Sequence, residues 1–121
     1  MQAAFRATIL SSLIALTACA PMQRPTAAAS FGSMPVRYRE AIAAQLERTL
    51  KDADSARIKC GQPFKAYENN LSGSIRWMGY GVDCEVNAKN SFGAYVGFRP
   101  FSFYFSGERI YTPDTTPDRV E

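Results

Sequence analysis

The sequence predicts an α+β fold, in which one N-terminal amphipathic helix packs on a small antiparallel sheet of three to five strands. Two patterns lead to this prediction. Apolar side chains recur at helical spacing between residues 36 and 51, and apolar and polar side chains then alternate with the period of a β-strand. The chain has 121 residues, which is the length of one domain.

The helix is expected over residues 36–51. Its apolar stripe repeats every four residues and consists of Tyr38, Ile42, Leu46 and Leu50. Ser33 can cap the helix, and Pro35 suits its first turn. Such a stripe needs a partner surface, which the strands that follow it supply.

Three stretches predict strands. Residues 56–60 alternate small or apolar side chains with basic ones, and residues 80–87 alternate between two faces. The inner face of the second stretch consists of Tyr80, Val82, Cys84 and Val86. In residues 101–106 the inner face consists of Phe101, Phe103 and Phe105. A hairpin turn at residues 106–108 then leads to a short strand at 109–111. Residues 62–75 are expected to form a loop or an irregular hairpin.

The N-terminus resembles the signal peptide of a bacterial lipoprotein. Residues 1–18 carry a short basic region and then an apolar run that is too short to span a membrane. Residues 16–19, Leu-Thr-Ala-Cys, fit a lipobox, in which Cys19 takes a diacylglycerol. An alternative cleavage after Ala20 would leave Pro21 first, which an ordinary signal peptidase handles poorly. The resemblance implies a lipid anchor, and Ala20 implies the periplasmic face of the outer membrane.

The three cysteines then receive separate roles. Cys19 is expected to be lipidated, which leaves Cys60 and Cys84 as a pair in an oxidising compartment. The alternative is that these two are unpaired buried thiols. The predicted organisation is a signal peptide at residues 1–18, a lipidated cysteine and flexible tether at 19–32, one domain at 33–111 and a disordered tail at 112–121.

The composition argues against several functions. Histidine is absent, so the usual general base and the commonest metal ligand are missing. Removal of residues 1–18, which contain Arg6, would lower the net charge from +3 to +2, which is too small to indicate nucleic-acid binding. Asp83 and Glu85 share a strand face, and their carboxylates are separated by a distance that inverting glycosidases use. The favoured interpretation is that both carboxylates face solvent and have no catalytic role. We therefore expect no enzyme activity, no metal and no cofactor.

Two stretches together resemble a family of small, uncharacterised bacterial exported proteins, many of them lipoproteins. They are LKDADSARIK at residues 50–59 and VNAKNSFGAYVGFRPFSF at residues 86–103. Ala53 replaces the proline often found in the first motif, which softens that turn. The resemblance covers residues 36–111 and implies a single exported domain. It implies no activity and no site residues.

The segment NAKNSFGAYVGF, residues 87–98, is the candidate interaction surface. It combines amides and a cation with aromatic rings, a mixture that suits recognition of peptide or sugar. The candidate residues are Asn87, Lys89, Asn90, Phe92, Tyr95 and Phe98, with Trp77 as a further member. The favoured alternative is a β-hairpin with its own turn chemistry and core aromatics.

Three hypotheses follow. The first is a non-enzymatic, lipid-anchored envelope protein that offers residues 87–98 or a sheet edge to a protein partner. The second is a periplasmic binding module for cell-wall glycan or peptide, which would use Tyr95, Trp77 and Lys89. The third, ranked last, is hydrolysis by Asp83 and Glu85.

Overall fold

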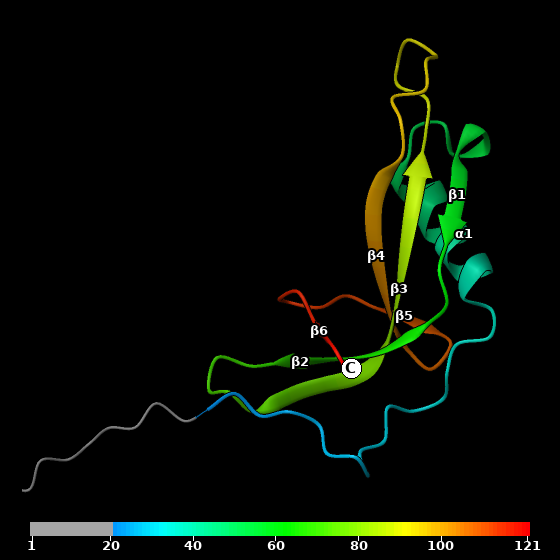
Figure 1. The fold of residues 1–121 in the computed structure, drawn as a ribbon. Coiled ribbons are helices and arrows are strands. Elements are labelled where there is room, and N and C mark those ends of the chain that lie inside the picture. The colour runs from blue at the N-terminus through cyan, green and yellow to red at the C-terminus, as the bar shows by residue number, and fades with distance from the viewer. Residues whose placement is uncertain (1–20) are drawn as a thin grey trace, which may run out of the picture.

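The computed structural model describes residues 21–121 and contains one α-helix and one antiparallel sheet of six strands (Figure 1). The helix is α1 (Tyr38–Thr49), and a 3-10 turn, η1 (Ala53–Ser55), follows it. The strands are β1 (Arg57–Cys60), β2 (Phe64–Asn69), β3 (Ile75–Asn87), β4 (Arg99–Ser106), β5 (Arg109–Tyr111) and β6 (Asp118–Arg119). The α+β prediction is confirmed, although the sheet has more strands than expected.

Strand β3 is the spine of the sheet. One edge of β3 pairs with β2 over its first half and with β1 over its second half, and the other edge pairs with β4. The sheet bends strongly along β3, so that it has two arms (Figure 1). We call the part built on β1 and β4 the upper arm and the part built on β2 and β6 the lower arm.

Strand β3 carries two glycines near the point where its pairing changes from β2 to β1. A side chain at Gly79 would overlap the ring of Trp77 and the carbonyl oxygen of Phe105. A side chain at Gly81 would meet the ring of Phe64 at 2.6 Å. Glycine is therefore required at these positions, because aromatic rings and the neighbouring strand occupy the space that a Cβ atom would need.

Helix α1 covers one face of the upper arm and forms the main core. Tyr38, Ile42 and Leu46 of the predicted stripe are buried there. The strand residues that they face are Val82, Cys84, Val86, Phe103 and Phe105. The alternation of β3 and β4 therefore buries the predicted faces, with two exceptions: Tyr80 is only half-buried and lies outside the core, and Phe101 is 38% exposed.

The N-terminus of α1 differs from the prediction. Ser33 does not cap it, and the helix begins at Tyr38, after Pro35. The carboxylate of Glu108, in the β4–β5 turn, instead accepts hydrogen bonds from the backbone N–H groups of Val36 (2.7 Å) and Arg37 (3.1 Å). These bonds lower the pKa of Glu108 below its ordinary value. A charged acceptor from a distant turn thus takes the place of the local cap.

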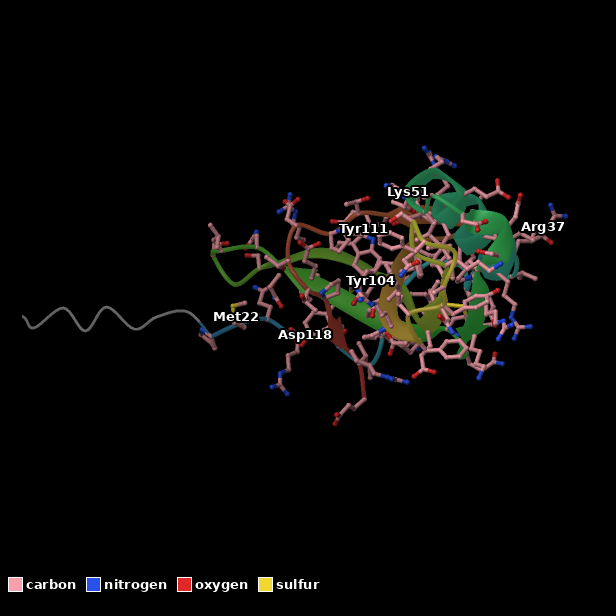
Figure 2. All side chains as sticks on the ribbon, turned by 90° about the horizontal axis from the view of Figure 1, so that it is seen from above. Met22, Arg37, Lys51, Tyr104, Tyr111 and Asp118 are labelled. Atoms are coloured by element: carbon pink, nitrogen blue, oxygen red, sulfur yellow. A yellow bond between two sulfur atoms is a disulfide. The ribbon has the colours of Figure 1, made fainter. Side chains whose placement is uncertain are left out.

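The opposite face of the sheet carries a second, aromatic core. Trp77 stacks on Tyr111 with ring centroids 4.5 Å apart and meets Tyr104 edge-on at 6.0 Å. Tyr104 and Tyr111 lie close together in the middle of the molecule (Figure 2). The indole N–H of Trp77 donates to the hydroxyl of Ser106 at 2.8 Å. Both faces of the sheet are therefore partly buried.

Residues 62–75 lie in a hairpin, which is one of the two alternatives expected for this stretch. Strand β2 and the first half of β3 form a hairpin there, with a register shift between Glu68 and Asn69. Of the two expected alternatives the irregular hairpin is confirmed and the loop was wrong; the polar side chains of β2 conceal its alternation. Glu68 is one of them, and it is 1% exposed.

The prediction of a disordered tail at residues 112–121 was also wrong. Strand β6 pairs with β2, and the N–H of Val120 donates to the carbonyl of Lys65 at 2.9 Å. The buried carboxylate of Glu68 accepts hydrogen bonds from the backbone N–H groups of Asp114 (2.9 Å) and Thr115 (3.0 Å). The tail is thus held by a buried acceptor and by strand pairing, and Pro117 is its one buried side chain.

The expected flexible tether likewise lies on the domain over its described part. Residues 21–32 form no helix or strand, but the N–H of Gln23 donates to the carbonyl of Gly73 at 2.8 Å. Phe31 is 7% exposed and lies under the ammonium group of Lys65. Cys19 and the signal-peptide prediction fall outside the described residues.

The predicted bridge between Cys60 and Cys84 is present. The two residues stand directly opposite each other on β1 and β3, with Cα atoms 4.1 Å apart. Ile58, which pairs with Val86, shares their face but remains 37% exposed. Within residues 21–121, no helix is long and apolar enough to cross a membrane.

Candidate interaction surface

Residues 88–98 form a hairpin that projects beyond the paired part of the upper arm (Figure 1). Its two strands meet at one bridge, between Lys89 and Tyr95. The turn depends on Asn90, whose side-chain oxygen accepts hydrogen bonds from the N–H groups of Phe92 (3.0 Å) and Ala94 (3.1 Å). Gly93 has a φ of 79°, which is why glycine suits this position.

Asn87 holds the base of the hairpin. Its side chain is buried, and its amide oxygen accepts a hydrogen bond from the N–H of Gly97 at 3.0 Å. Asn87 and Asn90 therefore use their polar atoms to shape the hairpin, so the proposed turn chemistry is present. Neither amide oxygen needs a ligand to complete its hydrogen bonding.

The aromatic residues of the hairpin do not form a core. Phe92 is 92% exposed, and every residue from 90 to 102 belongs to the exposed class. The large apolar side chains that share this exposure are Phe92, Tyr95, Val96, Phe98 and Phe101. Several exposed large apolar side chains on one ordered segment favour an interaction site. We call residues 88–98 the hairpin surface.

Cations from β1 hold the inner aromatic rings of the hairpin surface. The guanidinium of Arg57 lies 4.4 Å from the ring centroid of Tyr95, and the ammonium of Lys59 lies 4.4 Å from that of Phe98. Lys89 approaches the Tyr95 ring at 5.5 Å. The hydroxyl of Tyr95 donates to the carbonyl of Ser55 at 2.8 Å. Tyr95 therefore braces the hairpin against β1, whereas Phe92 contacts water.

The charge around the hairpin surface is predominantly positive. Residues 88–98 contain a lysine and no acid, and Arg99 follows directly. On β1, Arg57 stands opposite Asn87, and only Lys59 stands opposite a carboxylate, that of Glu85. A partner that offers both apolar and acidic groups would complement this surface.

Trp77 does not belong to the hairpin surface. It is 9% exposed, lies on the face opposite α1 and contacts Tyr104 and Tyr111 of the second core. Its position near the start of β3, in the lower arm, separates it from residues 88–98. Trp77 therefore cannot join Tyr95 and Lys89 in one glycan site.

Asp83 and Glu85 lie exposed on one face of β3, as expected. Asp83 accepts a hydrogen bond from the hydroxyl of Ser102 at 2.8 Å, and Glu85 lies opposite Lys59 and Pro100 in the neighbouring strands. Both carboxylates thus have ordinary surface neighbours. Across residues 21–121, His, Cys, Asp and Glu side chains form no cluster of three or more that could hold a metal ion.

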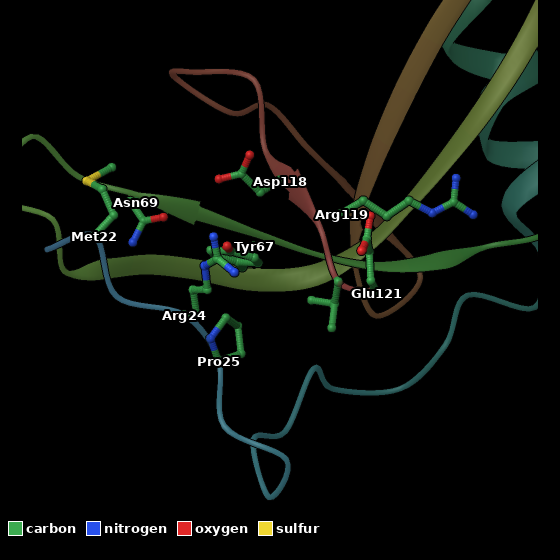
Figure 3. Close-up of a pocket in the computed structure, with 9 residues that line it drawn as sticks. Met22, Arg24, Pro25, Tyr67, Asn69, Asp118, Arg119 and Glu121 are labelled. Carbon is green, nitrogen blue, oxygen red and sulfur yellow. The ribbon is translucent and has the colours of Figure 1, made fainter.

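A pocket of about 600 Å³ lies in the lower arm, where the N-terminal segment passes β6 (Figure 3). Its charged side chains are two cations and two anions: Arg24, Arg119, Asp118 and Glu121. Arg119 also covers the ring of Phe64 at 4.2 Å. The balanced charge gives the pocket no preference for an anionic or a cationic ligand.

Comparisons with known proteins give no family. No family model, no curated protein and no solved structure matches this chain. The resemblance to small exported proteins stays a prediction from the two quoted motifs.

Sequence reasoning missed one feature of the site. Asn90-Ser-Phe-Gly-Ala has a counterpart in Asn70-Leu-Ser-Gly-Ser, which forms the β2–β3 turn with the same pattern of hydrogen bonds. In each turn, a single large apolar residue, Leu71 or Phe92, points into water. The shared Asn-x-x-Gly spacing was the signal that could have located both turns.

Proposed function

We propose that the protein is a non-enzymatic, lipid-anchored protein of the bacterial cell envelope that binds a protein partner through the hairpin surface. The observation that supports this proposal best is the exposure of Phe92 at the tip of an ordered turn. Exposed phenylalanine is unfavourable in water, and burying one side chain fully is worth about 1.5–3 kcal/mol. Asn90 and Gly93 fix the turn, so little ordering remains to oppose binding.

The envelope location is supported by two independent features. The lipobox at residues 16–19 provides a cysteine that can be acylated after export. The Cys60–Cys84 bridge suits an oxidising compartment, which the periplasm is. Ala20, which follows the acylated cysteine, favours the outer membrane over the inner one.

The partner's chemistry follows from the hairpin surface. Phe92, Val96 and Phe98 require an apolar recess, and the cations of β1 and Lys89 favour acidic groups at its rim. A protein surface offers both together. Because Trp77 is buried elsewhere, the glycan alternative loses the platform that stacking on sugar rings would need.

In-cell photo-cross-linking tests the proposal. A benzophenone amino acid would replace Phe92 in one strain and Glu47 in another, since Glu47 is exposed on α1 and is not part of the hairpin surface. We expect one dominant protein adduct from position 92 and none from position 47. Equal adducts at both positions, or adducts only with cell-wall fragments, would contradict the proposal.

The anchor needs its own test. Cys19→Ser removes the acceptor thiol without touching the described domain. We expect the variant to move from the membrane fraction to the soluble periplasmic fraction. Unchanged membrane retention would show that Cys19 does not anchor the chain.

A further inference from the structure

The turn between β2 and β3 is built to expose one apolar side chain. The side-chain oxygen of Asn70 accepts hydrogen bonds from the N–H groups of Ser72 (3.1 Å) and Ser74 (3.0 Å), and Gly73 has a φ of 88°. Leu71 lies within this ordered turn and is completely exposed. Nothing in the described domain covers it.

The N-terminal segment is attached to the same turn. The N–H of Gln23 donates to the carbonyl of Gly73 at 2.8 Å, and the side chain of Asn69 donates to the carbonyl of Gln23 at 2.9 Å. Met22 lies against Gly73 and remains 60% exposed. Leu71 and Met22 line the same shallow pocket and thus form a small apolar end on the lower arm, where Figure 2 shows Met22.

The covalent distance to the anchor is short. Met22 lies three positions after Cys19, and three extended residue steps span at most about 11 Å. Acyl chains on Cys19 would therefore hold the β2–β3 turn within that distance of the bilayer. Because the segment from residue 21 onward is docked on the domain and is not a long flexible tether, it limits the orientations that the domain can take relative to the bilayer.

We propose that the β2–β3 turn rests on the bilayer, with Leu71 and Met22 in contact with lipid, as a second membrane contact beside the acylated cysteine. This inference rests on the proposed lipid anchor. A second contact fixes the orientation of the domain, which a single anchor does not do. The hairpin surface, at the far end of the other arm, is thereby held in a defined direction.

The contact is apolar rather than electrostatic. The charged groups around this end balance, since Arg24 and Arg119 are accompanied by Asp118 and Glu121 (Figure 3). Arg76 forms an ion pair with Asp114. The turn should therefore contact vesicles of neutral phospholipid as well as those that contain anionic lipid, with little dependence on salt.

Fluorescence quenching on vesicles tests the inference with the full chain, processed in bacteria. Leu71→Cys supplies one free thiol for an environment-sensitive dye, and Glu47→Cys is the matched control on the exposed face of α1. The parent chain should take no dye, because Cys19 is acylated and Cys60 is bonded to Cys84. In phosphatidylcholine vesicles with spin-labelled acyl chains, we expect about twofold quenching at position 71 and none at position 47.

The outcomes separate the two proposals. A protein that stays on the vesicles with no quenching at position 71 overturns this inference and leaves the anchor intact. A protein that does not stay on the vesicles, and whose parent chain accepts dye at Cys19, overturns both. Quenching at position 71 that persists at high salt supports the apolar contact. Because Leu71 is fully exposed, the substitution leaves the fold unchanged, and unchanged circular dichroism verifies this.

Discussion

Tyr111→Phe tests how the C-terminal segment is held to the sheet. The hydroxyl of Tyr111 donates to the carboxylate of Glu68 at 2.9 Å, while its ring stacks on Trp77. Phenylalanine keeps the stacking and removes only the hydroxyl. Removing one hydrogen bond to a buried charged group costs about 1.5–3 kcal/mol. We expect the free energy of unfolding, measured by urea denaturation at pH 7, to fall by that amount.

The pH dependence of the same variant provides a second check. Burial alone would raise the pKa of Glu68, but hydrogen bonds from Tyr111, Thr115 and Asp114 outweigh it and lower the pKa below 4.5. A lowered pKa in the folded state stabilises the fold above the unfolded pKa, and this stability is lost as the pH falls through the folded value. The difference between wild type and Tyr111→Phe should therefore shrink between pH 5 and pH 3.

A loss below about 0.5 kcal/mol at pH 7 would refute the reasoning, because it is within the range of ordinary surface changes. A loss that does not vary with pH would show that the Glu68 carboxylate is not the group involved. Hydrogen exchange at Asp114 and Thr115 locates the effect. We expect Tyr111→Phe to accelerate exchange of these two amides relative to wild type, and to accelerate it more than it does for the amides of β3.

Other variants test the remaining packing. The Cys60→Ser/Cys84→Ser double variant should lose about 3–4 kcal/mol of unfolding free energy, measured by urea denaturation and compared with the oxidised wild type. Gly79→Ala should cost about 1–3 kcal/mol through overpacking, whereas Gly61→Ala, where a Cβ meets only an ordinary contact at 3.7 Å, should change little. Glu108→Gln should speed hydrogen exchange in the first turn of α1; an unchanged exchange rate would contradict the capping role.

Local patterns explain which parts of the fold were predictable. The four-residue stripe of α1 and the alternation at residues 80–87 both arise because each element buries one face. These two patterns depend only on residues a few positions apart. The bridge between Cys60 and Cys84 was predictable for another reason, because assigning Cys19 to the lipid anchor left two cysteines to pair.

The missed elements depend on contacts between distant residues. Strand β6 and the segment before it are polar and contain prolines, so no local pattern distinguishes them from a frayed end. Their order comes from the buried carboxylate of Glu68 on β2, which lies more than forty positions away. The cap of α1 also depends on a distant residue, because Glu108 lies more than seventy positions from the N–H groups that it binds.

The candidate site was only partly predictable for a related reason. The segment 87–98 was singled out by its mixture of amides, glycines and aromatics, yet composition does not show which rings face water. The structure assigns Asn87 and Asn90 to shaping the hairpin, Tyr95 to bracing it, and Phe92 to solvent. Trp77 was included because it is aromatic, whereas its strand register places it in the second core.

The affinity of the cross-linked partner for two matched variants tests the central claim most directly. Phe92→Ala and Leu71→Ala each remove one exposed apolar side chain from an Asn-x-x-Gly turn, so neither should change stability. If the hairpin surface binds the partner, Phe92→Ala should raise the dissociation constant by at least about 30-fold, as expected for an aromatic anchor worth 2 kcal/mol. Leu71→Ala should leave it unchanged. Equal affinities for both variants would contradict the account.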